Sequence, residues 1–294
     1  MSDYNDINDN EIRIIGNAEQ PRTTRRKPLY RKWWFWALLV ALILLSLTPW
    51  LLTRNINRKL AATSEVGVVE NEPSPTHPYI VECEPATVLV RDTAINDVSL
   101  RLYLPVNALP ELQVGNPDPK DESIILALQA ADIRADNQEI VGAFVRKGEL
   151  LSRGSAKKGF CAIIDWSIQL GMAENTPLFE ESIDKEGDFF RQYPLVVEGK
   201  MVENKPKGKA LRRALCEMDG KILAVSSMER ESFHDFAQAL ADMGVQNAIY
   251  LTGADAYGFC RSDADGTPKT TVWGVRQTGK AFENVNFIVW RVAE

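Results

Sequence analysis

The chain has few of the residues that usually build metal centres or nucleophilic active sites. Its 294 residues include two histidines and four cysteines, and no two cysteines have the Cys-x-x-Cys spacing. A zinc site is therefore not expected. The sequence also has no Gly-rich phosphate loop and no Ser/His/Asp nucleophile pattern. From the residues alone we predict no metal and no cofactor.

Positive charge is also in deficit. Lys plus Arg number 34 against 40 for Asp plus Glu, which gives a formal net charge of −6. A nucleic-acid partner is not expected, because a surface that binds phosphates is basic. The charge is unevenly distributed. Residues 1–53 carry seven basic and five acidic side chains, whereas residues 54–294 carry 27 and 35.

One long apolar run separates these two parts. Residues 33–53 carry no charge, and as a helix rising about 1.5 Å per residue they would reach about 30 Å, the thickness of a bilayer core. This pattern predicts a transmembrane helix, with the lipid bilayer as a partner. Tryptophans stand near both of its ends, as expected at the headgroup level.

The flanking charges give the expected orientation. The positive-inside rule places the N-terminus in the cytoplasm and residues 54–294 outside it. A cleaved signal peptide is the alternative, but its charged region and its apolar region would both be too long. We therefore predict an uncleaved signal anchor of a single-pass protein, with an extracytoplasmic domain that is periplasmic in a bacterial envelope. Six basic residues precede the run: Arg22, Arg25, Arg26, Lys27, Arg31 and Lys32.

The remaining residues divide into a tail, a spacer and one domain. Residues 1–32 are polar and are predicted to be a disordered cytoplasmic tail. Residues 54–80 hold three closely spaced prolines, typical of an extended linker. Residues 81–294 then form one extracytoplasmic domain. The predicted fold class is α+β: a mixed sheet with few helices, preceded by the transmembrane helix.

Short apolar or alternating runs predict strands along this domain, and one segment predicts a helix. Residues 233–243 have an apolar stripe at helical spacing, with Ser232 as N-cap, Asp235 as its capping-box partner and Gly244 as the stop. Asp219-Gly220 predicts a hairpin turn. The predicted strands are residues 87–91, 98–104, 123–128, 160–164, 194–200, 221–226, 246–251 and 286–292.

The order of several motifs between residues 123 and 260 resembles the phosphodiester glycosidase family. A strand "P-L-V-x-D-G", a hairpin "R-T-A-I-G … D-G", a helix and a loop "N-L-D-G-G-G-S" follow an upstream "N-G-G-F-F". The corresponding segments here are 128–133 (LQAADI), 142–149 (GAFVRKGE), 193–200 (YPLVVEGK), 212–221 (RRALCEMDGK), 233–244 and 247–255 (NAIYLTGAD).

Several family residues are replaced. Residues 129–131 read Gln-Ala-Ala in place of Asn-Gly-Gly. Thr252 stands in place of the Asp of Leu-Asp-Gly-Gly, Ala254 in place of a following Gly, and Arg213 in place of the Thr of the Arg-Thr pair. Arg212 and Gly253 are retained. The resemblance therefore supports the fold more strongly than the activity.

The resemblance implies a set of site residues. A sugar-1-phosphodiester hydrolase needs a carboxylate near the anomeric carbon, for which Asp255 and Asp132 are the candidates. Arg212, with Arg213 beside it, would clamp the phosphate oxygens. Thr252 and Gly253 would form the substrate loop. Loop-capping or turn-forming roles for the two aspartates remain open.

Two functions and one disulfide follow as expectations. The first function is a membrane-anchored phosphodiester glycosidase-like hydrolase that acts on a glycosyl phosphodiester of envelope glycans. The second is a catalytically degenerate module of the same fold that binds a glycan or a protein. The resemblance would place Cys216 and Cys260 around one cleft as a disulfide pair, and four buried free thiols are the alternative.

Overall fold

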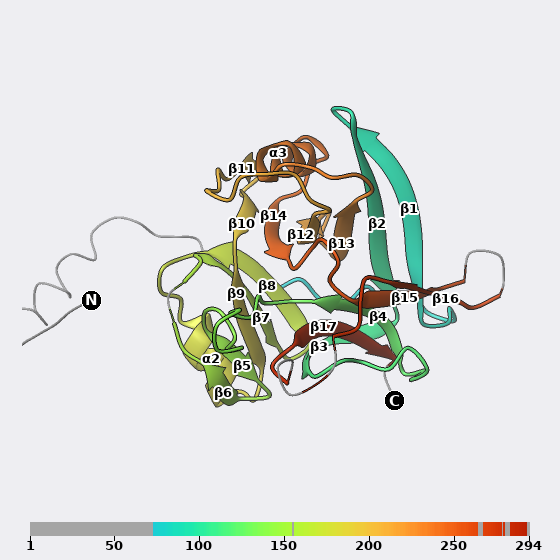
Figure 1. Cartoon of the computed structure of the whole chain (residues 1–294). Helices are drawn as coiled ribbons and strands as arrows, with labels where there is room; N and C mark the ends of the chain where they lie inside the picture. Colours follow the sequence, from blue (N-terminus) through green and yellow to red (C-terminus); the bar gives the residue numbers. More distant parts are fainter. Residues whose placement is uncertain (1–72, 155, 264–266, 278, 280–282, 293–294) are drawn as a thin grey trace, which may run out of the picture. The chain divides into compact units, whose positions relative to one another are not determined.

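The computed structural model describes residues 73–292 except 155, 264–266, 278 and 280–282. These residues form three antiparallel sheets and two short helices (Figure 1). The predicted class α+β with a mixed sheet is therefore wrong, because strands dominate and every pairing between neighbouring strands is antiparallel. The prediction underestimated the strand content because several half-exposed strands lack a clean apolar alternation, among them β6 (Glu149–Ser152) and β16 (Lys269–Trp273).

The largest sheet has seven strands in the order β1-β2-β13-β12-β14-β10-β11 (Figure 1). Helix α3 (Phe233–Asp242) packs on one face of it through an apolar cluster that includes Phe236, Leu240 and Leu195. The strands are β1 (Thr87–Ile95), β2 (Val98–Val106), β10 (Pro194–Val197), β11 (Lys200–Met201), β12 (Arg213–Met218), β13 (Lys221–Ser227) and β14 (Asn247–Leu251).

Two five-stranded sheets complete the fold. One has the order β16-β15-β4-β17-β3, and the other has the order β6-β5-β9-β7-β8 and carries α2 (Leu178–Asp184). Their remaining strands are β3 (Ala108–Val114), β4 (Ile124–Gln129), β5 (Phe144–Arg146), β7 (Gly159–Ile164), β8 (Ser167–Met172), β9 (Asp188–Gln192), β15 (Gly258–Ser262) and β17 (Asn286–Val292).

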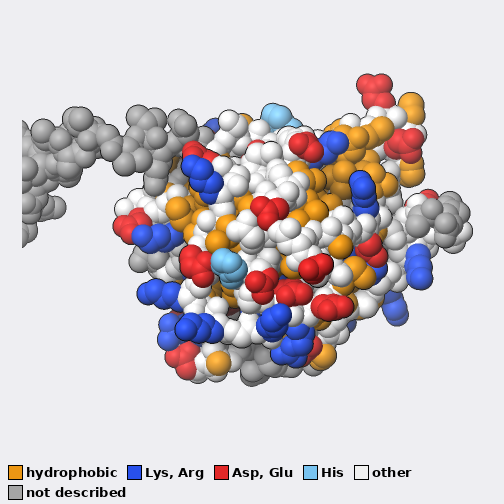
Figure 2. Space-filling model, turned by 90° about the horizontal axis from the view of Figure 1, so that it is seen from above, with side chains coloured by type: hydrophobic (Ala, Val, Ile, Leu, Met, Phe, Trp, Pro, Cys, Tyr) orange, Lys and Arg blue, Asp and Glu red, His pale blue; other side chains and the backbone are white. Residues whose placement is uncertain are grey.

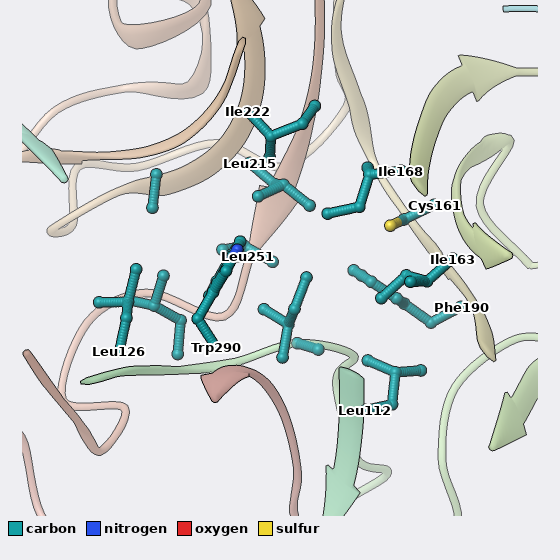
Figure 3. Close-up of a cluster of buried hydrophobic side chains, with 14 of the residues drawn as sticks. Leu112, Leu126, Cys161, Ile163, Ile168, Phe190, Leu215, Ile222, Leu251 and Trp290 are labelled. Atoms are coloured by element: carbon teal, nitrogen blue, oxygen red, sulfur yellow. The ribbon is translucent and has the colours of Figure 1, made fainter. Parts of the chain in front are cut away.

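The three sheets share one buried core. Figure 3 shows side chains from all of them directed toward one another, among them Leu215 and Leu251 from the large sheet, Trp290 from β17 and Phe190 from β9. Burial of such side chains is the main force that holds the sheets together. The loops where strands of different sheets meet are therefore fixed by a common core.

The predicted helix and hairpin are confirmed. The Ser232 hydroxyl accepts the backbone N–H of Asp235 at 3.0 Å, so the predicted N-cap is in place. The Asp235 carboxylate accepts the Ser232 hydroxyl at 2.8 Å, in place of the backbone N–H that a capping box would use. Asp219 and Gly220 have φ angles of 51° and 66° and connect β12 to β13. Positive φ at both central residues is typical of a hairpin turn whose twist matches that of its strands.

The membrane predictions are corrected by the structure. No helix among residues 73–292, as far as they are described, is long and apolar enough to cross a bilayer. The predicted span, residues 33–53, and the predicted tail, residues 1–32, lie outside the described residues. The single-pass topology, the signal anchor and the extracytoplasmic location gain no support from the described residues and are not carried further.

The last residues of the predicted linker pack against the domain. Thr76 is buried and pairs with Ile168 of β8 through two backbone hydrogen bonds. Its hydroxyl donates to the carboxylate of Glu217 at 3.0 Å. His77 is exposed, and its ring nitrogen Nδ1 lies 2.7 Å from the Ser167 hydroxyl.

The predicted Cys216–Cys260 disulfide is wrong. Cys83, Cys161, Cys216 and Cys260 are all free thiols, and Cys83 alone of these is exposed. Cys216 packs into the cluster beneath α3, whereas Cys260 packs into the core that the three sheets share. The two side chains therefore belong to different apolar clusters.

Candidate functional site

The loops that follow β4 and β14, which hold the predicted site residues Asp132, Thr252 and Gly253, meet where these strands end. The backbone N–H of Thr252 donates to the carbonyl of Gln129 at 3.1 Å. The Thr252 hydroxyl lies 3.2 Å from the carbonyl of Ala130 and 3.0 Å from Oδ1 of Asp132, so its single proton bonds one or the other. The structure thus brings together two of the predicted site residues, Asp132 and Thr252.

A lysine that the sequence did not indicate completes this cluster. The Lys157 ammonium forms an ion pair with Oδ2 of Asp132 and donates to Oε1 of Gln192 at 2.9 Å. It also lies 4.6 Å from the centre of the Tyr193 ring. The Lys157 side chain is 7% exposed and that of Asp132 is 32% exposed. We call Asp132, Lys157, Gln192, Tyr193 and Thr252 the Asp132 cluster.

Burial and charge act in opposite directions on Lys157. Burial lowers the pKa of its ammonium, because desolvation disfavours the charged form, and the Asp132 carboxylate partly restores this pKa. The ion pair therefore maintains a charge that would otherwise be expensive to bury. Lys157 lies in the loop before β7, outside every motif that the sequence indicates, so the sequence does not predict its role.

The loop at residues 130–132 is positioned by Asn286 of β17. The Asn286 side chain is fully buried; its Oδ1 accepts the N–H of Ala131 at 2.7 Å and its Nδ2 donates to the carbonyl of Ala131 at 3.2 Å. Both backbone groups of Ala131 are thus satisfied by one side chain. Asn286 was also missed, because a lone polar residue at the start of an apolar strand has no distinctive spacing.

Arg212, the predicted phosphate clamp, has its guanidinium bound within the protein. Its Nε donates to the carbonyl of Glu231 at 2.9 Å and its Nη2 to the carbonyl of Gly208 at 2.6 Å, and the group stacks 4.2 Å from the centre of the Phe233 ring. The residue is 7% exposed. Acidic and basic side chains are interspersed over the face that carries α3 (Figure 2). A phosphate would have to displace the contacts of Arg212 to reach it.

Arg213 points the other way and reaches the predicted substrate loop. Its Nη1 donates to the carbonyl of Ala256 at 2.9 Å and lies 3.4 Å from that of Thr252. Its guanidinium carbon lies 5.5 Å from the centre of the Trp273 ring. Burial lowers the pKa of this guanidinium, with the carboxylate of Asp255 opposing the shift. Arg213 therefore holds the loop at residues 252–256 in place.

The loop itself has a tight backbone. Gly253 has no room for a side chain, because a Cβ atom there would lie 2.3 Å from the carbonyl oxygen of Leu211. Ala254 has a φ of 50°, in the left-handed region. Asp255 is exposed, and among the described residues its carboxylate has no hydrogen-bond partner. The structure thus records no contact that brings Asp255 to Asp132.

Among the same residues, no group of three His, Cys, Asp or Glu side chains is arranged to hold a metal ion. The chemistry available at the Asp132 cluster is that of an accessible carboxylate supported by a buried cation. Such a group can accept hydrogen bonds from hydroxyls or stabilise positive charge.

The comparisons with known proteins support the fold. No family model and no curated protein matches the chain. The catalytic domain of zebrafish N-acetylglucosamine-1-phosphodiester alpha-N-acetylglucosaminidase, solved in a form auto-inhibited by its pro-peptide, is similar with a TM-score of 0.53 and 11% identity. The similarity covers 76% of this chain and 89% of that chain.

A hypothetical protein from Synechocystis is similar with a TM-score of 0.43 and 13% identity, over 71% of this chain and 64% of that chain. At 11% identity, the first similarity establishes a distant relationship of fold. The resemblance to phosphodiester glycosidases is confirmed at that level.

Proposed function

We propose that the domain is a binding module that recognises a glycosyl phosphodiester without hydrolysing it. The observation that carries this proposal is the pairing of Asp132 with Lys157 where the two motif loops meet. About a third of the Asp132 side chain is exposed. An ionised carboxylate accepts hydrogen bonds from sugar hydroxyls, and such charge-assisted bonds are stronger than neutral ones.

Positive charge near the same loop favours an anionic group on the ligand. Lys157 reaches the loop through Asp132, and the buried guanidinium of Arg213 contacts the carbonyls of Thr252 and Ala256 directly. Cations in a partly desolvated site attract anions more strongly than cations in water. The fold similarity to a phosphodiester glycosidase domain makes a sugar phosphodiester the first ligand to test.

The arrangement argues against hydrolysis. Glycosidases generally use two carboxyl groups that flank the scissile bond. Within the described residues, Asp132 supplies the only carboxylate that contacts the cluster, and it is bound by a lysine and a threonine. Position 252, where the family has Asp, holds Thr. The cluster therefore offers a ligand one partly exposed carboxylate and, within the described residues, no second carboxyl group.

The test measures binding and turnover on the same samples. The full chain is titrated calorimetrically with nucleotide sugars and alkyl glycosyl phosphates, and release of free sugar is assayed in parallel. We expect binding without sugar release, weakened about tenfold by Asp132→Asn, as for loss of a charge-assisted hydrogen bond. Asp255→Asn is the control and should bind as the wild type does.

Two results would contradict the proposal. Sugar release that Asp132→Asn or Asp255→Asn abolishes, with affinity retained, would identify a hydrolase. If none of the phosphodiesters bound, glycosyl phosphodiesters would be excluded as ligands. Thermal unfolding of each variant confirms that it is folded before its binding is interpreted.

A further inference from the structure

A pocket of about 280 Å³ opens on the face of the β6-β5-β9-β7-β8 sheet that carries α2. Its walls come from the loop after β6, the loop before α2, the start of α2 and strand β9. The residues that the argument uses are Arg153, Glu174, Asn175, Phe179, Glu180 and Arg191.

This pocket and the Asp132 cluster lie on opposite faces of β9. Neighbouring residues of a strand point to opposite faces of its sheet. The Gln192 side chain bonds Lys157 in the cluster, whereas Arg191 lines the pocket. Phe190 likewise belongs to the shared core and Phe189 to the cluster beneath α2. The pocket is therefore a separate site.

Arg191 holds the pocket walls in place. It is 5% exposed, and its guanidinium donates to the carbonyls of Ala173 at 2.7 Å, Glu174 at 2.9 Å and Lys157 at 3.3 Å. One side chain thus joins the loop before α2 to the loop before β7. A site whose walls are fixed in this way loses little conformational freedom when a ligand binds.

The lining combines an aromatic ring with hydrogen-bonding groups. Phe179 is half-buried and packs edge-on against Phe189, with ring centres 5.4 Å apart. Arg153, Asn175 and Glu180 are exposed, and their side chains have no hydrogen-bond or ion-pair partner among the residues that the structure describes. An apolar face beside unengaged polar groups is typical of small-molecule sites.

Charge indicates which ligand class fits. The lining contains two basic residues, Arg153 and Arg191, and two acidic ones, Glu174 and Glu180, so its formal charges balance. Glu174 is itself paired with Lys158 at 2.5 Å. A phosphate or carboxylate would meet the acidic side chains, and a purely apolar ligand would leave the polar groups without partners. A neutral ligand with many hydroxyls avoids both costs.

We propose that this pocket binds one neutral sugar ring of a glycan. The C–H face of the ring packs on Phe179, and Asn175 and Glu180 bond its hydroxyls. A volume of about 280 Å³ lies just below the range of about 300–1,000 Å³ for pockets of drug-sized ligands, which suits a single ring. This site does not depend on the proposed function of the Asp132 cluster.

The test uses the full chain and neutral monosaccharides: glucose, galactose, mannose and N-acetylglucosamine. Saturation-transfer NMR and calorimetry measure binding to the wild type, Asn175→Ala and Glu180→Gln. Asp184→Asn, which changes an exposed acid of the same helix outside the pocket, is the matched control. We expect each pocket variant to weaken binding about threefold to tenfold, as for loss of one hydrogen bond. Asp184→Asn should leave it unchanged.

Four results would overturn the assignment. The first is that none of the four sugars binds the wild type. The second is that both pocket variants bind as tightly as Asp184→Asn does. The third is that N-acetylglucosamine 1-phosphate binds more tightly than the neutral sugar and loses this advantage in Arg153→Gln, because the pocket would then select an anion. Loss of binding in Asp132→Asn alone would assign the sugar to the Asp132 cluster instead.

Discussion

The guanidinium groups of Arg212 and Arg213 lie on opposite sides of the seven-stranded sheet. Arg212 stacks on Phe233 of α3, and Arg213 stacks on Trp273, which packs against the core that the three sheets share. Two neighbouring residues that the sequence suggests as a single phosphate clamp therefore serve two different regions. Arg213 alone of the pair reaches the loop at residues 252–256.

Arg212→Ala should destabilise the fold. The change removes the donor to the Gly208 carbonyl and one of two donors to the Glu231 carbonyl, which keeps the N–H of Ala210, and it removes the stacking on Phe233. We expect the free energy of unfolding to fall by about 2–4 kcal/mol, measured by urea denaturation. Arg230→Ala is the control: within the described part of the chain, this exposed residue donates only to the carbonyl of Lys209, and its loss should cost less. Equal costs for the two variants would contradict a structural role specific to Arg212.

The sequence predicts local structure here better than it predicts the site. The cap of α3, the turn at Asp219-Gly220 and most long strands follow from patterns confined to a few neighbouring residues. The face of the sheet to which the Arg212 side chain points depends on the residue at which β12 begins. A shift of one residue in the register of a strand moves each side chain to the opposite face. A motif match without a structure cannot fix that register.

The pH dependence of stability should respond to the Asp132–Lys157 pair. Burial lowers the pKa of Lys157, so at pH values between this lowered pKa and the usual one the unfolded chain binds more protons. The free energy of unfolding therefore rises with pH across that interval. Asp132→Asn removes the carboxylate that opposes this lowering. The pKa of Lys157 then falls further, and the interval extends to lower pH.

We thus expect Asp132→Asn to be less stable than the wild type at pH 7, with the deficit narrowing as the pH rises. Urea denaturation at pH values from 7 to 10 measures this trend. When Lys157 is replaced by Met, there is no buried ammonium to titrate. Adding Asp132→Asn to Lys157→Met should therefore change the free energy of unfolding by the same amount at every pH. Parallel stability curves for the wild type and Asp132→Asn would show that Lys157 does not discharge.

Asn286→Ala should loosen the loop that presents Asp132. It removes both partners of the Ala131 backbone from a fully buried position. The expected cost is about 1–3 kcal/mol in the free energy of unfolding, the range for an unsatisfied buried polar group. Asn137→Ala is the control at an exposed position of the same loop. Its side chain bonds Glu139 in solvent, so its loss should cost less than that of the buried Asn286. A similar cost for both would argue that Asn286 does not fix the loop.

Asn286 and Lys157 show why the site could not be predicted in full. Asn286 contacts a residue 155 positions earlier in the chain, and Lys157 pairs with one 25 positions earlier. Neither contact follows from the periodicity of a helix or strand. Both arise because the core brings strand ends of different sheets together, and that arrangement is a property of the whole fold.

The four thiols should differ in reactivity. Cys83 is exposed, whereas burial raises the pKa of the Cys161 and Cys216 thiols and raises that of Cys260 to about 11. Thiolates are the reactive species. An alkylating reagent at pH 7.5 should therefore label Cys83 and leave Cys161, Cys216 and Cys260 unlabelled while the protein is folded. Mass spectrometry after unfolding without reductant should then find three further labels. Recovery of a linked Cys216–Cys260 peptide would contradict the structure.

Ala254→Gly should stabilise the protein. Ala254 has a φ of 50°, and its N–H donates to the carbonyl of Leu211 at 2.8 Å, so the loop holds it in the left-handed region. That conformation costs a residue with a Cβ atom about 1–2 kcal/mol, whereas glycine adopts it freely. Glycine also gives the unfolded chain more conformational entropy, which lowers the free energy of unfolding by about 0.5–1 kcal/mol and offsets part of this gain. The net gain expected from denaturation is about 0.5–1 kcal/mol.

The control for this change is Ala256→Gly in the same loop. Ala256 is not among the described residues with positive φ, so glycine there only adds freedom to the unfolded chain and should destabilise by about 0.5–1 kcal/mol. Opposite signs for the two changes would show that the left-handed backbone at Ala254, where the phosphodiester glycosidase motif has glycine, is present in solution. A loss of stability in Ala254→Gly as large as that in Ala256→Gly would mean that the loop adopts a different backbone, which would also contradict the contact between Thr252 and Asp132.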